Sequence, residues 1–184
     1  MWSYHENADC ELQNTKREFK MKYQFSFLDK QCAEKILPIL FKILYSNMSV
    51  IAPTGNTYEQ DFQLWQSSVA PALSKQQRQI VLMHSDDEIV GYFQYYVNDN
   101  VFMMEEIQII SNHQGTGLFR LFFMWLIDKL NKDIKIIEAY SHKNNTKSQN
   151  ILKHLGLQSI GMNKNGNLYH YRGDFNHFVN VFIL

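Results

Sequence analysis

The chain has 184 residues, of which 45% are hydrophobic and 14% aromatic. This is enough apolar material for one substantial core and too much for a disordered or linker-dominated chain. Eighteen lysine and arginine residues balance eighteen aspartate and glutamate residues, so the chain lacks the positive field on which non-specific nucleic-acid binding depends. No stretch approaches the roughly 18 apolar residues of a membrane span, and the start of the sequence lacks the apolar segment of a signal peptide.

The first twenty residues are polar and are interpreted as a loosely held arm (residues 1–20), so we expect a single folded domain over residues 21–184. The two cysteines, Cys10 and Cys32, lack the spacing of metal ligands. They indicate a reduced, cytoplasmic protein. Because the histidines are scattered and form no His-x-x-x-His pair, no metal site is predicted.

The N-terminal half predicts one strand followed by two helices. Residues 23–27 alternate in polarity as a strand does, and Asp29 could cap the helix whose apolar periodicity follows. Pro38 is expected to kink or interrupt that helix. A second helix is expected over residues 58–69, ending before Pro71.

Extended segments predominate from residue 79 onward. Turn residues separate three apolar runs, which predicts an antiparallel meander over residues 80–83, 89–97 and 101–110. The remaining elements are expected as helix 118–130, strand 134–140, helix 145–155 and strands 157–162 and 168–171, and the apolar tail 175–184 could add a strand to this sheet or to a partner's. The order predicts an α/β fold in which helices cover both faces of one central sheet.

A glycine-containing turn, Ser111-Asn-His-Gln-Gly-Thr-Gly, joins strand 101–110 to helix 118–130. Gly115 and Gly117 let the backbone approach a ligand without a Cβ clash, and the helix N-terminus offers free N–H groups. Such a turn binds phosphate well, although a two-glycine turn before a helix is, taken alone, more often only a tight connection. It is not a P-loop, because no Gly-Lys-Ser/Thr follows, and Arg120 replaces the last glycine of the dinucleotide-binding pattern.

A second segment follows the next expected strand: Asn145-Thr-Lys-Ser-Gln-Asn-Ile-Leu-Lys-His-Leu-Gly. Together the two segments resemble the GNAT superfamily of acyl-CoA-dependent N-acetyltransferases, over roughly residues 77–172. The turn follows the family's diphosphate signature but has Phe119 at a position that is usually glycine or alanine. The second segment has Leu152 where the family usually has a tyrosine that acts as general acid.

The resemblance implies a central, mixed, mostly antiparallel sheet of six to seven strands and binding of acetyl-CoA as a co-substrate. In similar enzymes the strand that corresponds to residues 101–110 parts from its neighbour, and its free edge forms hydrogen bonds with the pantetheine arm. The alternative is that strand 101–110 of this chain is an ordinary paired core strand. The cofactor-binding residues implied are Ile107, Ile109, Gln114, Gly115, Thr116, Gly117, Leu118, Phe119, Asn145 and Ser148, with Asn145 also able to cap its helix.

The candidate catalytic residues are Glu105 and Glu106 on strand 101–110, and Tyr140. Strand alternation places the two glutamates on opposite faces, where either would lie among apolar groups that raise its pKa toward a useful range for a general base. The register favours Glu105, with Glu106 in reserve, and each could instead be a surface acid. Tyr140 is one candidate to protonate the leaving thiolate, and a core tyrosine is the alternative.

We therefore expect an N-acetyltransferase in which a primary amine of a small molecule or protein attacks acetyl-CoA directly. The acceptor pocket is expected between the early helices and the last hairpin, with Trp65, Tyr58 and Phe62 as candidate lining residues. The alternative is a catalytically silent acyl-CoA-binding or regulatory module on the same fold.

RNA binding through the aromatic segment 92–96 is disfavoured by the neutral charge. Basic residues outnumber acidic ones over residues 128–172, beside the turn, where one phosphorylated cofactor could use them. The apolar tail leaves a homodimer open.

Overall fold

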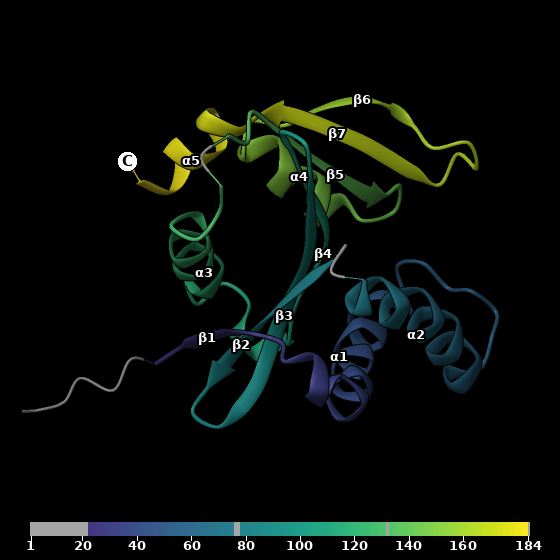
Figure 1. The fold of residues 1–184 in the computed structure, drawn as a ribbon. Helices are drawn as coiled ribbons and strands as arrows, with labels where there is room; N and C mark the ends of the chain where they lie inside the picture. The colour runs from purple at the N-terminus through teal and green to yellow at the C-terminus, as the bar shows by residue number, and fades with distance from the viewer. Residues whose placement is uncertain (1–21, 76–77, 132, 184) are drawn as a thin grey trace, which may run out of the picture.

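The computed structural model describes residues 22–75, 78–131 and 133–183, and the arm expected at residues 1–20 lies outside these ranges (Figure 1). The elements in chain order are β1 (Gln24–Phe27), α1 (Ala33–Met48), α2 (Tyr58–Ser74), β2 (Gln79–Ser85), β3 (Glu88–Asn98), β4 (Val101–Ile109), α3 (Leu118–Ile127), β5 (Ile136–His142), α4 (Thr146–His154), β6 (Gln158–Met162), β7 (Leu168–Asp174) and α5 (Phe175–Ile183). Short 3₁₀ helices occupy Lys30–Cys32 and Ser111–His113.

One sheet of seven strands organises the molecule, in the order β1-β2-β3-β4-β5-β7-β6. Every neighbouring pair is antiparallel except β4 and β5, which are parallel. The mixed, mostly antiparallel sheet predicted from the resemblance is therefore confirmed. Strands β4 and β5 pair only from Val101↔Ile136 to Met104↔Ala139, so the rest of β4 has a free edge toward β5.

Helices cover both faces of the sheet, as predicted (Figure 1). Helices α1 and α2 pack on one face of β2 and β3 and form the smaller core, which contains Leu37, Leu40, Ile43, Val69, Leu73, Ile80, Leu82 and Tyr92. Helices α3, α4 and α5 pack on the other face and form the larger core, to which Phe93, Phe102, Phe122, Phe123, Phe178 and Tyr171 belong. The split between β4 and β5 lies where the sheet passes from its N-terminal to its C-terminal half.

The two prolines of the early helices do not end them. Pro38 lies inside α1, and α2 continues through Pro71 to Ser74, so the expected end before Pro71 is wrong. A proline removes one backbone donor from a helix, but Val69 and Leu73 on either side of Pro71 are buried in the smaller core. We infer that this apolar burial outweighs the missing hydrogen bond.

The C-terminal tail is the helix α5 rather than a strand, so the expectation of an added strand is wrong. Its phenylalanines Phe175, Phe178 and Phe182 recur at helical spacing and are buried in the larger core. Asp174 caps the helix, because its carboxylate accepts the backbone N–H of His177 at 2.8 Å. The tail therefore completes the cover over α3 instead of extending the sheet.

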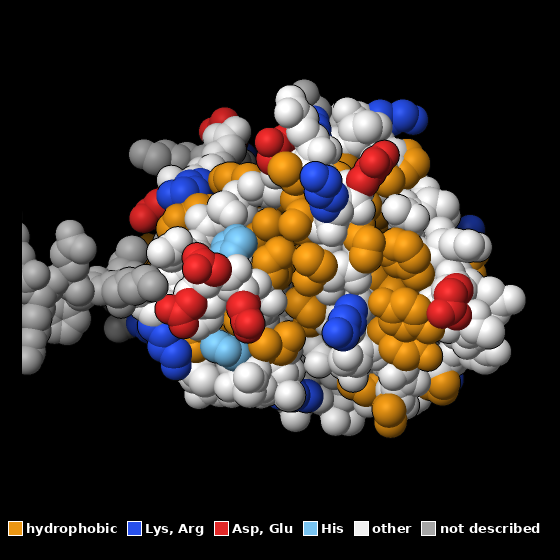
Figure 2. All heavy atoms as spheres, turned by 90° about the horizontal axis from the view of Figure 1, so that it is seen from below, with side chains coloured by type: hydrophobic (Ala, Val, Ile, Leu, Met, Phe, Trp, Pro, Cys, Tyr) orange, Lys and Arg blue, Asp and Glu red, His pale blue; other side chains and the backbone are white. Residues whose placement is uncertain are grey.

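The surface has an uneven distribution of side chains. The face seen from below carries hydrophobic side chains across its middle and a group of acidic side chains toward one end (Figure 2). Large exposed hydrophobic residues include Phe27 in β1 and Ile39 in α1. In the described part of the chain, no helix has both the length and the apolar content needed to cross a membrane.

Candidate active site

A β-bulge in β4 brings Glu105 and Glu106 to the same side of the sheet. Gln94 of β3 pairs with Glu106, while the next residue, Tyr95, pairs with Met104, so Glu105 is an additional residue in β4. The predicted placement of the two glutamates on opposite faces is wrong, because a bulge interrupts the alternation of side chains. Both carboxylates now lie on the side of the sheet that α1 and α2 cover.

Burial removes Glu106 from much of the solvent on the face of the sheet that α1 and α2 cover. The hydroxyl of Tyr92 donates a hydrogen bond to its carboxylate, and Trp65 of α2 lies nearby. Burial raises the pKa of Glu106 to about 7, and the opposing effects of the Tyr92 hydrogen bond and the Trp65 indole are smaller. The residue nevertheless keeps part of its surface accessible. A carboxylate of this kind is suited to exchange a proton near neutral pH.

Glu105 is held by Arg78, a residue that the sequence interpretation did not include. The guanidinium donates to one carboxylate oxygen at 2.6 Å and contacts the other through Nε, so the pair is bidentate. Gln94 also donates to Glu105, at 3.2 Å. With both oxygens engaged, Glu105 is the less available of the two carboxylates. Arg78 directly precedes β2, but only the fold shows which acid it meets.

Tyr140 lies on β5, one residue beyond the last pair with β4, and is 42% exposed. Its ring stacks on His170 of β7, with centroids 4.4 Å apart and planes inclined by 14°. His170 in turn lies 3.0 Å from a carboxylate oxygen of Glu138. Burial raises the pKa of Tyr96 on β3, and the Glu105 and Tyr140 charges raise it further, so both of these groups lie near Tyr96. The core-tyrosine alternative for Tyr140 is therefore wrong.

The backbone of Ile107 and Ile109 faces the free edge of β4. The N–H of Ile110 donates to Val90 of β3 at 3.0 Å, and successive residues of an antiparallel strand direct their backbone groups to alternate sides. Ile109 and Ile107 therefore point away from β3, toward the side on which pairing with β5 has ended. An extended ligand with peptide-like groups could pair with this edge.

Two side chains already contact this edge. The carbonyl oxygen of Ile109 accepts hydrogen bonds from Asn47 Nδ2 at 3.1 Å and from Gln114 Nε2 at 2.8 Å. Asn47 lies on α1 and also donates to the side chain of Gln108 at 2.9 Å. The end of β4 is thus tied both to α1 and to the glycine-containing turn.

The turn has the backbone geometry of a shallow cradle that an anion could occupy. Gly115 and Gly117 adopt φ of 75° and 85°, and a Cβ added to either would meet nothing within 4 Å. The N–H of Leu121 bonds the carbonyl of Gly117, so the preceding amides of α3, which begins at Leu118, remain at the helix start. Open space beside free amides at a helix N-terminus fits a phosphate group.

Phe119 does not obstruct the cradle, although it departs from the family signature. Its ring packs on Phe123 and Phe182, with centroids 4.8 and 6.0 Å away. These partners belong to α3 and α5, so the ring lies in the interface between the two helices. The signal for this packing was the apolar tail, which the sequence interpretation assigned to a strand.

Tyr23, just before β1, holds the turn from its other side. Its hydroxyl lies 3.1 Å from His113 Nδ1 and 2.9 Å from Thr116 Oγ1. The Thr116 hydroxyl also donates to the carbonyl of His113 at 2.8 Å. The predicted cofactor residue Thr116 is therefore engaged in shaping the turn.

Asn145 caps α4, as expected, since its side chain accepts the N–H of Ser148 at 3.0 Å. The adjacent Lys147 donates from Nζ to the Gln114 side chain at 2.6 Å. The two segments that carry the family resemblance therefore meet in space. Leu152 of the same helix is buried in the larger core, at 7% exposure, and offers no hydroxyl.

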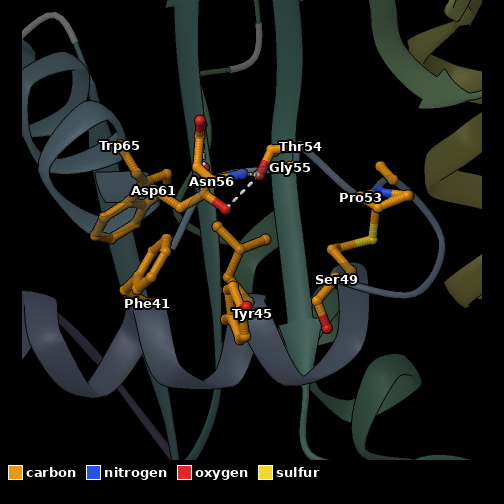
Figure 3. Close-up of a pocket in the computed structure, with 12 residues that line it drawn as sticks. Phe41, Tyr45, Ser49, Pro53, Thr54, Gly55, Asn56, Asp61 and Trp65 are labelled. Atoms are coloured by element: carbon orange, nitrogen blue, oxygen red, sulfur yellow. Dashed lines mark hydrogen bonds between the residues drawn. The ribbon is translucent and has the colours of Figure 1, made fainter. Parts of the chain in front are cut away.

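A pocket of about 330 Å³ opens between α1, the connection to α2, and α2 itself (Figure 3). Phe41, Tyr45 and Trp65 supply aromatic walls, and Asp61 also lines the pocket. The Asp61 carboxylate accepts hydrogen bonds from the connecting segment, from Thr54 at 2.7 Å and Asn56 at 2.9 Å. Of the three predicted lining residues, Trp65 lines this pocket.

The other two predicted lining residues, Tyr58 and Phe62, pack against the ring of Phe41, with centroids 5.1 and 5.3 Å away. They support the aromatic wall from behind. Trp65 lies both in the pocket wall and beside Glu106, so it connects the pocket with the carboxylate.

Comparison with known proteins gives one family and a common fold. Residues 38–157 match the model of the acetyltransferase (GNAT) family, which is more than half of the chain. No curated protein matches the chain. Solved structures with the same fold have low sequence identity to it.

An acetyltransferase from Thermus thermophilus superposes with a TM-score of 0.63 at 19% identity, covering 84% of this chain and 97% of the other. The PaiA N-acetyltransferase of Thermoplasma acidophilum, solved with coenzyme A, gives 0.63 at 13% identity and covers 84% and 99%. Mutant forms of the spermidine/spermine N-acetyltransferase SpeG of Vibrio cholerae give 0.57 at 14% identity and cover 86% and 97%.

Proposed function

The chain belongs to the GNAT acetyltransferase family, and we propose that it is an N-acetyltransferase that moves an acetyl group from acetyl-CoA to a primary amine of a small molecule or protein. The observation that carries this proposal is the position of Glu106. Its carboxylate has a pKa raised to about 7 by burial, and the residue lies on the part of β4 that no longer pairs with β5. The amine-acetylating relatives of the same fold give further support.

Acetyl-CoA would be held at two places. The amides of the turn and of the start of α3 would bind the diphosphate, because Gly115 and Gly117 leave open space there. The pantetheine arm would pair with the backbone of Ile107 and Ile109 along the free edge. Asn145 and Ser148, which form the cap of α4, lie on the opposite side of the split.

Glu106 is the proposed general base, although the strand register favoured Glu105. An ammonium group must lose a proton before its nitrogen can attack, and the partly accessible Glu106 carboxylate can take that proton near neutral pH. Glu105 would instead fix Arg78 and Gln94 beside the reacting groups. Acetyl-CoA supplies a thioester, whose acyl carbon bonds the amine nitrogen as its bond to sulfur breaks.

Tyr140 is the proposed proton donor to the departing thiolate. Leu152 cannot fill this role, whereas Tyr140 is exposed just beyond the point where β4 and β5 part. Stacking on His170 fixes the plane of its ring. A thiol has an unperturbed pKa of about 8.5, so the effect of losing Tyr140 would be moderate near neutral pH.

The aromatic pocket beside Trp65 is the proposed acceptor site. Its aromatic walls suit an amine with an apolar or cationic portion. Because Trp65 contacts both the pocket and Glu106, an acceptor bound against Trp65 would have its amine near Glu106.

Thiol release with a panel of primary amines tests the activity, alongside calorimetric titration with acetyl-CoA. We expect release of coenzyme A with at least one amine. Binding of acetyl-CoA without turnover on any amine would favour the silent binding module, which the apolar Leu152 motivates.

The cofactor site is tested by Gly117→Asp, which places a carboxylate where the diphosphate would lie. Affinity for acetyl-CoA should fall more than about tenfold, equivalent to about 1.4 kcal/mol. Gly166→Asp is a matched control, because Gly166 also has positive φ and open space but lies in the β6–β7 turn. Equal affinities of both variants would contradict the assignment.

A further inference from the structure

We propose that Lys147 is a ligand of the acetyl-CoA diphosphate, an inference that rests on the proposed function. Lys147 lies in the first turn of α4, and its ammonium group is 2.6 Å from the side-chain oxygen of Gln114. Gln114 directly precedes Gly115, the first glycine of the cradle. The fold therefore places this lysine beside the cradle, across the split between β4 and β5.

Lys147 has a neutral hydrogen-bond partner. Among the residues that the structure describes, its side chain forms no ion pair, and its hydrogen-bond partner is the neutral amide of Gln114. An ammonium group has three N–H donors, and the Lys147 side chain is exposed. A phosphate oxygen would accept from it more strongly than an amide oxygen does.

The cradle contains no lysine or arginine of its own. The attraction of the turn Ser111-Asn-His-Gln-Gly-Thr-Gly for an anion therefore comes from amide dipoles and about half a charge at the helix start. Arg120, in the first turn of α3, donates to the carbonyls of Val181 and Phe182 at 3.3 and 2.9 Å. Arg120 is thus committed to the end of α5, whereas Lys147 reaches the turn itself.

The same lysine connects the diphosphate with the edge of β4. Gln114 accepts from Lys147 through Oε1 and donates through Nε2 to the carbonyl of Ile109. When Lys147 turns to a phosphate oxygen, the Gln114 side chain loses the contact that orients it. The Ile109 carbonyl then keeps the hydrogen bond from Asn47 and has its second acceptor position available to the pantetheine arm. Binding at the cradle and binding along the edge would in this way support each other.

The experiment measures the affinity of Lys147→Gln for acetyl-CoA and for S-acetylpantetheine, which lacks the diphosphate. We expect a loss of about tenfold for acetyl-CoA, typical of one charged hydrogen bond, and none for S-acetylpantetheine. The loss should shrink at high salt, as an exposed ionic contact does. Lys153→Gln is the matched control, since Lys153 is exposed on the last turn of the same helix.

The outcomes separate the inference from the proposed function. Wild-type affinity for acetyl-CoA in Lys147→Gln, or an equal loss with both ligands, would overturn the role of Lys147 alone. An equal loss in Lys153→Gln would do the same, because it would reduce the effect to general surface charge. Failure of the wild-type protein to bind acetyl-CoA would overturn the proposed function, and this inference with it.

Discussion

Glu105 and Glu106 are adjacent in sequence, yet the fold gives them different chemical environments. Arg78 engages both oxygens of Glu105, while Glu106 is shielded from solvent and accepts a hydrogen bond from the Tyr92 hydroxyl. Which glutamate meets which partner depends on the β3–β4 register. Sequence reasoning could therefore identify the pair of acids but not divide the roles between them.

The first prediction concerns the pH dependence of acetylation. A base with a pKa of about 7 must be deprotonated to act. For a fixed amine, kcat/KM should therefore rise with pH through a midpoint near that value, once the ionisation of the amine itself has been accounted for. Glu106→Gln should lower kcat/KM roughly 100-fold or more and remove that midpoint. Glu105→Gln serves as the comparison and should retain it. A midpoint that persists in Glu106→Gln would exclude Glu106 as the base.

The second prediction concerns stability. Because the folded-state pKa of Glu106 is raised above the ordinary value of 4.5, the folded protein binds this proton more tightly than the unfolded chain. The free energy of unfolding should therefore decrease as pH rises from about 4.5 to 7, by up to roughly 3 kcal/mol. Above that range the contribution is constant.

Urea denaturation at pH 5 and pH 8 measures this contribution, with wild type and Glu106→Gln compared at each pH. The variant should gain stability relative to wild type at pH 8 and not at pH 5. An equal difference between the two proteins at both values would contradict the burial of an ionised Glu106.

At the scale of elements, the helices and strands with the strongest periodic patterns were predicted well. Helices α3 and α4 and the β2–β4 meander follow directly from apolar spacing and turn residues. The extent of α2 and the nature of α5 were not predicted, because both depend on tertiary packing. Pro71 is tolerated where its neighbours are buried, and the tail is helical because its phenylalanines meet α3.

The third prediction tests the contribution of α5. Phe178 has 0% exposure and packs edge-on against Phe123, with centroids 5.3 Å apart. Phe178→Ala should lower the free energy of unfolding by about 3–5 kcal/mol, the usual range for a buried phenylalanine. Phe27→Ala is the control, because Phe27 is 43% exposed, and it should lose less than Phe178→Ala. Equal losses in a denaturation experiment would show that α5 is not part of the folded core.

At the scale of the whole molecule, few paired residues join the two halves of the sheet. Strands β4 and β5 share only the stretch from Val101 to Met104. The candidate site lies where this pairing ends, with the turn and α3 on one side and α4 on the other. The family resemblance implied the split, while its contacts, such as Lys147 with Gln114, required the folded chain.

The fourth prediction follows from the free edge. If acetyl-CoA pairs with β4, the amides of Ile107 and Ile109 should exchange hydrogen more slowly when it is bound, by roughly tenfold or more at saturating concentration. Amide exchange measured by NMR checks this. The amides along β6, which lies at the far edge of the sheet, should be unaffected. Uniform slowing across the molecule would indicate general stabilisation instead of edge pairing.

The bulge in β4 has an evolutionary consequence. Phe102 and Met104 before it, and Ile107 and Ile109 after it, all contact the larger core, although their numbering changes from even to odd. If Glu105 were deleted, β4 would pair with β3 without a bulge, and each of these side chains would stay on its present face. Glu105 is therefore equivalent to a one-codon insertion. A descendant could lose it, and the side chains on both sides of the deletion would still point to the same faces of the sheet.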